Sequence, residues 1–153
     1  MTNKLHFQYC QKLVVFSTDM NEVLLCKRAG EADLDEVFSF PGGKMETTDE
    51  SLIAGMQREK NEEIGVAAKI KLYPQFSTNL LYKKKDGNTV VLPHYLAIFK
   101  SGEIHINEEY SEYCWVKIQN LRSFEPKVSN IPDTVVTLLK LLPLVQEADY
   151  VEL

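Results

Sequence analysis

The sequence predicts an α/β protein in which a mixed β-sheet is covered by helices on its faces. Apolar, β-rich runs dominate the chain, and only two segments repeat their apolar residues at helical spacing. The length of 153 residues, with 44% hydrophobic and 25% charged residues, is that of one domain with one core. No internal repeat, low-complexity tract or linker divides the chain, so we expect a single domain over residues 1–153.

Runs of aliphatic and β-branched residues, bounded by turn signals, predict the strands. They lie at 12–17, 22–28, 37–40, 66–76, 78–85, 88–100 and 113–118. The first two runs flank the turn signal TDMN and predict a β-hairpin, and Asp86-Gly87 predicts a second hairpin. The short strand at 37–40 ends in a Pro-Gly-Gly turn, whose glycines would let the backbone approach a ligand closely. Pro93 predicts an edge strand or a bulge at its position.

Two segments show helical spacing. The first is expected to begin with Thr48 or Asp49 as its N-cap and to stop at Gly65. The second spans 131–148, has a proline in its first turn, and should kink or end at Pro143. With the strands between them, these helices would cover the two faces of the sheet.

Charge, cysteines and termini limit the classes of function. The net charge of -5 argues against a broad basic surface for nucleic acid, although a local basic pocket for phosphates remains compatible with it. The three cysteines lack a CxxC spacing, which favours reduced thiols over disulfides or a zinc site. The first residues lack a signal-peptide pattern, and the most apolar run, at 135–145, is too short to span a bilayer. We expect a cytoplasmic protein that binds no membrane, and the sequence leaves a homodimer open.

The stretch REKNEEIG at 58–65 crowds three carboxylates, Glu59, Glu62 and Glu63, on one helix face. Like charges at this spacing repel by roughly 0.2–0.5 kcal/mol. One interpretation is a solvated helix face that also carries Arg58 and Lys60. The other is a site for a hard cation such as Mg²⁺, which takes oxygen ligands and makes close carboxylates tolerable.

The flanking residues favour the second interpretation. Residues 42–66, GGKMETTDESLIAGMQREKNEEIGV, resemble the Nudix box of the MutT-like nucleoside-diphosphate-X hydrolases. The matching positions are Gly43, Glu50, Arg58, Glu59, Glu62, Glu63, Gly65 and Val66. One residue more than the family spacing separates Gly43 from Glu50, so either Asp49 or Glu50 fills the early acidic position. Lys60 stands where the family has a bulky aliphatic residue, and we expect its stem to cover apolar surface while its ammonium reaches water.

The resemblance covers about 110 residues, roughly 12–121, and ends at a strand that contains Trp115. It implies a Nudix α/β/α sandwich with a mixed β-sheet between helices. It also implies a hydrolase that cleaves the pyrophosphate bond of a nucleoside diphosphate derivative with Mg²⁺ or Mn²⁺ as cofactor. The implied metal ligands are Gly42, Glu59, Glu62, Glu63 and Glu109, and the implied catalytic residues are Glu59, Arg58 and Glu109.

Some roles stay open between alternatives. The resemblance places the general base at Glu59 or on the downstream loop, at Glu109 or Glu112. Arg58 is expected to orient a carboxylate, with an exposed ion pair as the plainer alternative. His94 is expected to be a packing residue of the sheet.

The implied substrate-binding residues are Arg28, Lys44 and Asn130. An Arg at the place of Arg28 often meets substrate in the family, and Lys44 follows the glycine turn as a phosphate contact. Asn130 resembles a base-reading Asn in nucleotide-sanitising members, although it could equally cap the helix that follows. These residues favour a (deoxy)nucleoside triphosphate. Tyr82 is similar to a Tyr of dinucleoside polyphosphate hydrolases, which keeps that class open together with ADP-ribose-type substrates.

A function of another class is a non-catalytic, nucleotide-sensing Nudix-like regulator. The intact set of acidic residues argues against it, because a degenerate sensor would be expected to lose at least one of them. The lysines at 83–85 most simply guard an edge strand, with polyphosphate binding as the alternative.

Overall fold

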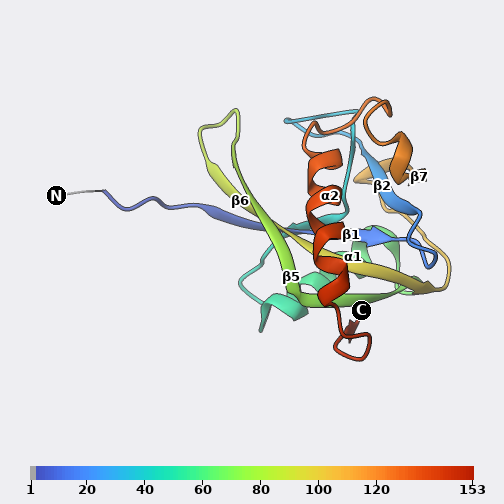
Figure 1. Ribbon diagram of the computed structural model, residues 1–153. Coiled ribbons are helices and arrows are strands. Elements are labelled where there is room, and N and C mark those ends of the chain that lie inside the picture. The colour runs from blue at the N-terminus through green and yellow to red at the C-terminus, as the bar shows by residue number, and fades with distance from the viewer. Residues whose placement is uncertain (1–2) are drawn as a thin grey trace.

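The computed structural model describes residues 3–153 and shows an eight-stranded sheet with two α-helices (Figure 1). The strands are β1 (Gln8–Phe16), β2 (Glu22–Arg28), β3 (Phe38–Ser39), β4 (Gly42–Lys44), β5 (Lys69–Lys83), β6 (Thr89–Ser101), β7 (Tyr110–Lys117) and β8 (Val151–Glu152). The helices are α1 (Leu52–Ile64) and α2 (Ile131–Leu141), with short 3-10 turns η1 (Ile118–Asn120) and η2 (Leu142–Leu144). The predicted mixed α/β class is confirmed.

The sheet is mixed because one pair of neighbours at its centre is parallel. The strands follow the order β3-β2-β1-β6-β5-β8, with β4 added to β1 and β7 added to β2. β1 and β6 are parallel, and the other pairs are antiparallel. β4 pairs with the first half of β1, which sets Gly42 opposite Lys12 and Gly43 opposite Gln11. Gly42 and Gly43, which were predicted to lie in a turn, thus begin the short strand β4 beside β1, and the name glycine turn is kept for residues 41–43.

Each face of the sheet has its own hydrophobic core, because successive side chains of a strand point to opposite faces. Leu13 and Val15 of β1 pack with Met56 of α1 on one face. Val14 and Phe16 pack with α2 on the other. Figure 1 shows α2, in orange-red, crossing the front of the sheet. The molecule is therefore the predicted sandwich of a mixed sheet between helices.

Two strand predictions are wrong in detail. The strands expected at 66–76 and 78–85 form the single strand β5, whose pairing with β6 is irregular between Tyr73 and Ser77, beside a proline. Pro93 lies neither at an edge nor at a bulge: β6 lies between β1 and β5, Pro93 pairs with Asn79, and the register with both neighbours does not shift there. The ladder between β1 and β6 is interrupted at residues 92 and 93, which accommodates a residue that has no N–H to donate.

The helix ends follow local capping chemistry. α1 begins later than expected, because Ser51 is the N-cap and its Oγ accepts a hydrogen bond of 3.0 Å from the N–H of Ala54. Neither Thr48 nor Asp49 has this role. Gly65 follows α1 with φ of 93°, a conformation that favours glycine. The second helix ends at Leu141, short of the expected end at 148, and Pro143 lies in η2, in line with the prediction that it kinks or ends the helix.

Lys60 is the clearest departure from expectation within α1. Its side chain is fully buried, and its ammonium does not reach water. Instead Nζ donates to the carbonyl oxygens of Gly65 at 3.1 Å and Ala68 at 2.7 Å. These carbonyls follow the end of α1, where intrahelical donors are no longer available. Lys60 thus stands where the family pattern has an aliphatic residue, and its ammonium caps the backbone carbonyls of the segment after the helix.

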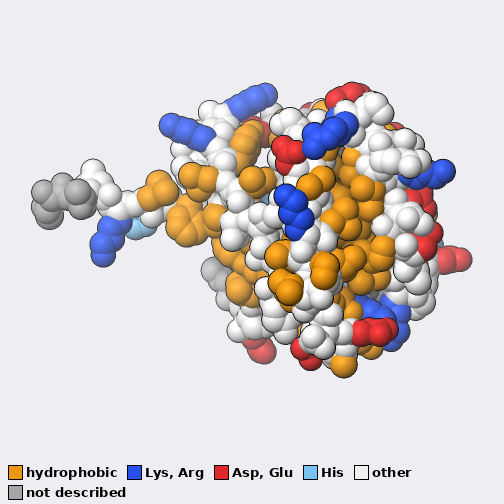
Figure 2. Space-filling model, in the orientation of Figure 1, with side chains coloured by type: hydrophobic (Ala, Val, Ile, Leu, Met, Phe, Trp, Pro, Cys, Tyr) orange, Lys and Arg blue, Asp and Glu red, His pale blue; other side chains and the backbone are white. Residues whose placement is uncertain are grey.

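The surface in Figure 2 mixes apolar and charged side chains, with basic ones at the tip of the β5–β6 hairpin. This tip carries the lysines at 83–85. Over residues 3–153 no helix is long and apolar enough to cross a membrane.

Candidate active site

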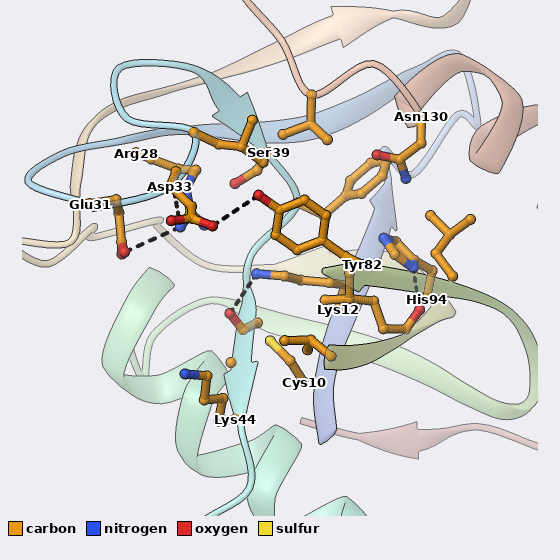
Figure 3. A pocket seen from close by; sticks show the side chains of 18 of the residues that line it. Cys10, Lys12, Arg28, Glu31, Asp33, Ser39, Lys44, Tyr82, His94 and Asn130 are labelled. Carbon is orange, nitrogen blue, oxygen red and sulfur yellow. Dashed lines mark hydrogen bonds and ion pairs between the residues drawn. The ribbon is translucent and has the colours of Figure 1, made fainter. Parts of the chain in front are cut away.

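A cavity of about 690 Å³ opens between β1, β6, the glycine turn and the start of α2 (Figure 3). Most residues predicted for the site line it: Arg28, Gly42, Lys44, Glu59, Glu63, Glu109 and Asn130. These residues come from elements far apart in the sequence, so the fold assembles them. Glu62 is exposed and lies outside the cavity wall, and Arg58 lies behind this wall.

Glu63 is the most deeply buried carboxylate of the cavity, with 3% of its surface exposed. Its Oε2 accepts hydrogen bonds from the N–H of Gly42 at 2.6 Å and the hydroxyl of Tyr110 at 2.9 Å. Burial raises the pKa of Glu63 to about 7, against the opposing effects of Lys12 and of these hydrogen bonds. The carboxylate is therefore held in place by neutral donors and a nearby ammonium.

Lys12 is a site residue that the sequence interpretation missed. It lies on β1, and its Nζ donates to the carbonyl oxygen of Gly42 at 3.0 Å. The strand register sets Lys12 beside His94 of β6 on the same face of the sheet. A charged residue entering an otherwise apolar strand run was the available signal, but only the pairing with β4 and β6 shows that it faces the cavity.

Arg58 binds several of the carboxylates in and beside α1 and lies outside the cavity lining. Its guanidinium binds Asp49 through both carboxylate oxygens at 2.9 Å. It also donates to Glu59 at 2.9 Å and to Glu62 at 3.3 Å. The hydrogen bonds from Arg58 lower the pKa of Asp49 to about 2. Asp49, rather than the exposed Glu50, therefore fills the early acidic position next to Arg58.

Glu59 lies against the backbone of the glycine turn. A Cβ on Gly43 would overlap the Glu59 carboxylate, so the glycine leaves the space that this side chain fills. Burial is the largest effect on the pKa of Glu59 and raises it, and the charges of Glu62 and Glu109 raise it further. Glu59 and Glu109 line the cavity and Glu62 lies just outside it, and like charges this close together are a place where a cation would be stabilised.

The donor set fits a hard divalent cation, which prefers carboxylate and carbonyl oxygens. Glu59, Glu63 and Glu109 line the same cavity, together with Gly42. Within residues 3–153 no three acidic, His or Cys side chains are already arranged to hold a metal ion. The carbonyl of Gly42 is held by the ammonium of Lys12, and one oxygen of Glu59 by Arg58.

The two downstream acids are placed differently. Glu109 lines the cavity, and its side chain accepts a hydrogen bond of 3.1 Å from the amide of Asn107. Glu112 lies on β7, more than half exposed, and pairs with Lys27 at 3.6 Å outside the cavity. Of the two, only Glu109 is close to the other carboxylates.

Near the start of α2 the cavity is lined by the apolar side chains of Phe40 and Ile131. Figure 3 shows His94 and Asn130 at this end. Asn130 occupies the N-cap position of α2 but makes no capping hydrogen bond, and its amide instead contacts the hydroxyl of Thr134 at 3.1 Å. His94 is 4% exposed and packs edge-on against Phe40, with the ring centroids 5.7 Å apart. Burial lowers the pKa of His94 to about 4, so the ring is neutral.

A loop crosses the mouth of the cavity to the β5–β6 hairpin. Asp33 accepts hydrogen bonds from the hydroxyl of Tyr82 at 2.9 Å and the N–H of Lys85 at 3.1 Å. Arg28 contacts Glu31 at 3.3 Å in the same loop, and its Nε is buried with no hydrogen-bond partner within residues 3–153. Its Nη2 lies 3.4 Å from the carbonyl oxygen of Asp33, and Arg28 lines the cavity, where a ligand could contact its guanidinium.

Comparison with known proteins gives the family. A model of the NUDIX domain matches residues 11–138. No curated protein matches the sequence. The MutT protein from Methanosarcina mazei Go1 is similar in structure, with 19% identity and a TM-score of 0.71 over 91% of this chain and 97% of that one.

Two further similar structures are named for a different activity or a different ligand. A C. elegans Ap4A hydrolase in a binary complex has 15% identity and a TM-score of 0.73 over 90% of this chain and 99% of that one. The NUDIX domain of Shewanella oneidensis NrtR, complexed with ADP ribose, has 19% identity and a TM-score of 0.71 over 91% and 90%. At these identities the likeness establishes the fold, while the domain match spans most of the sequence. The chain belongs to the Nudix family.

Proposed function

We propose that this protein is a metal-dependent pyrophosphohydrolase that cleaves a phosphoanhydride bond of a nucleoside diphosphate derivative, with (deoxy)nucleoside triphosphates as the favoured class. One observation carries the proposal: a single cavity has carboxylates and cations at one end and an apolar wall at the other. A nucleotide has the same polarity, with an anionic chain at one end and a flat, largely apolar base at the other.

The charged end would receive the phosphates. Lys44 is exposed beside the glycine turn, and Lys12 stands at the cavity floor. Within residues 3–153 neither forms an ion pair with a carboxylate, so both ammonium groups can bind phosphate oxygens. Arg28 would contact the substrate with the donors that its loop leaves free.

The carboxylates of α1 would hold the cation with the glycine turn. Glu59 and Glu63 are the ligands best placed by burial, Glu109 joins them from the downstream loop, and Glu62 would have to turn toward the cavity. A bound Mg²⁺ or Mn²⁺ supplies charge neutralisation on the phosphate oxygens and acidifies a water. Arg58 would fix the carboxylate of Glu59 without touching the substrate.

Two acids can accept the proton of the attacking water. Glu59 has one oxygen engaged by Arg58, which leaves its other oxygen to accept a proton. Glu109 also lines the cavity, and its side chain accepts a hydrogen bond from Asn107. The proton leaves the water as its oxygen attacks phosphorus, and the bridging oxygen departs with the pyrophosphate or nucleotide product.

The test is release of inorganic phosphate or pyrophosphate from deoxynucleoside triphosphates, dinucleoside polyphosphates and ADP-ribose with Mg²⁺. We expect kcat/KM for at least one triphosphate to exceed that of the other classes by about 10-fold. If a dinucleoside polyphosphate is hydrolysed most efficiently, the proposed triphosphate class is wrong and dinucleoside polyphosphates are the substrates. The enzyme proposal fails if no substrate turns over while nucleotides still raise the melting temperature, a result that would favour a sensor.

A further inference from the structure

The apolar end of the cavity contains one polar group whose hydrogen-bonding direction is fixed. Nδ1 of His94 lies 2.8 Å from the carbonyl oxygen of Leu92. A carbonyl oxygen can only accept, so Nδ1 carries the proton. The neutral ring then has a bare Nε2, which is an acceptor.

This acceptor faces the cavity. Figure 3 shows the second ring nitrogen of His94 on the side of the ring that faces Tyr82 and Asn130. Within residues 3–153 the only hydrogen bond of the His94 ring is the one between Nδ1 and Leu92. The edge-on contact with Phe40 holds the ring plane, and the bond to Leu92 holds its rotation.

The neighbouring polar groups can adapt to a ligand, whereas His94 cannot. Asn130 contacts the hydroxyl of Thr134, which can donate or accept, so either end of the Asn130 amide can turn to the cavity. Ser39 also lines the cavity, is 6% exposed, and its hydroxyl has no partner within residues 3–153. Buried polar groups without partners are costly, and a ligand with matching hydrogens would satisfy them.

We infer that Nε2 of His94 is a specificity-determining acceptor, and that the cavity selects nucleotides whose base carries an amino group. The inference rests on the proposed function only in placing the base at the apolar end of the cavity. An exocyclic amine supplies N–H hydrogens to Nε2 and to the neighbouring Asn130. A base that lacks the amine leaves the fixed acceptor buried and unpaired.

Nucleotide pairs that differ only in the amine test this directly. The pairs are dGMP with dIMP, and dAMP with purine deoxyriboside monophosphate. Calorimetric titration of the metal-free protein measures binding without turnover. We expect the amino nucleotide of at least one pair to bind about 10-fold or more tightly. Equal affinity within both pairs, or no binding of any of the four, would overturn the inference.

Two substitutions assign the preference to the ring nitrogen. His94→Asn keeps a donor for the carbonyl of Leu92 but has no atom at the Nε2 position, so the preference should disappear. His94→Gln reaches that position with an amide oxygen and should keep part of it. His105→Asn, at an exposed histidine paired with Glu103, is the matched control and should behave like the natural protein. Full preference in His94→Asn would overturn the role of Nε2.

The two proposals can fail separately. If the triphosphates are not hydrolysed but the pairs still differ in binding, the enzyme proposal fails and the acceptor stands. If the triphosphates are hydrolysed and the two nucleotides of each pair bind equally, the enzyme proposal stands and the inference about His94 fails. Should His94→Asn not fold, as judged by circular dichroism, the comparison within the pairs on the natural protein and on His94→Gln still decides.

Discussion

Replacing Glu63 by Gln should change how stability depends on pH. The ordinary pKa of this carboxyl is 4.5, and in the folded protein burial raises it to about 7. Between these values the folded chain holds a proton that the unfolded chain releases. Raising the pH through this window therefore removes stability from the metal-free protein: the contribution is complete below about 4.5 and lost above about 7.

The size of the effect follows from the two pKa values. At about 1.4 kcal/mol for each pH unit, the gap from 4.5 to about 7 corresponds to about 3 kcal/mol. Glu63→Gln keeps the shape and can still accept from Gly42 and Tyr110, but does not ionise. Its free energy of unfolding, compared with that of the natural protein, should rise by about 3 kcal/mol between pH 4.5 and 7.5.

Urea unfolding of the metal-free proteins at several pH values measures this difference. Glu62→Gln, at an exposed position on the same helix, is the control substitution with which the Glu63→Gln difference is compared at each pH. A Glu63→Gln difference that is constant with pH would show that Glu63 does not bind its proton more tightly in the fold, and the account of a buried, raised carboxyl would be wrong.

Three further substitutions test the supports of the site. Lys60→Leu should lower the free energy of unfolding by about 2 kcal/mol, because the carbonyls of Gly65 and Ala68 lose their donor; a higher melting temperature would show that aliphatic packing dominates. Lys12→Met should raise KM for a nucleotide about 10-fold with the fold intact by circular dichroism, and an unchanged KM would remove Lys12 from phosphate binding. Arg58→Lys should lose the two-pronged contact with its aspartate and about 1–2 kcal/mol of stability in thermal unfolding, whereas equal stability would make this contact unimportant.

The strands that local sequence determines were predicted well. The run at 22–28 corresponds residue for residue to β2, because both flanks carry turn signals. The expected break between 76 and 78 is absent, since pairing with β6 carries β5 past its proline. β8 was missed because two residues have no periodicity, and only their pairing with β5 defines the strand.

Within the site, the motif predicted the residues of α1 better than their surroundings. The spacing of Glu59 and Glu63 places both toward the cavity, as helical geometry requires. Glu62, one residue earlier than Glu63, falls on the exposed side instead. Lys12 and His94 could not be predicted, because they meet only through the parallel pairing of β1 and β6, which joins residues far apart in the chain.

The one-residue offset in the motif also has a structural explanation. Arg58 selects Asp49 by forming two hydrogen bonds with its carboxylate, while Glu50 stays in solvent just before the N-cap Ser51. The extra residue is thus accommodated before the helix starts. Sequence spacing alone left the two acids equivalent, and the contact geometry separates them.

The most direct test of the account is hydrolysis by Glu59→Gln and Glu109→Gln, with Glu112→Gln as the matched control. Steady-state kcat would be measured with Mg²⁺ and the best triphosphate, after circular dichroism shows that each variant is folded. The account predicts that at least one of the first two loses about 100-fold or more in kcat, while Glu112→Gln, whose side chain pairs with Lys27 outside the cavity, keeps full activity. Full activity in both Glu59→Gln and Glu109→Gln would contradict the claim that the carboxylates of this cavity carry out hydrolysis.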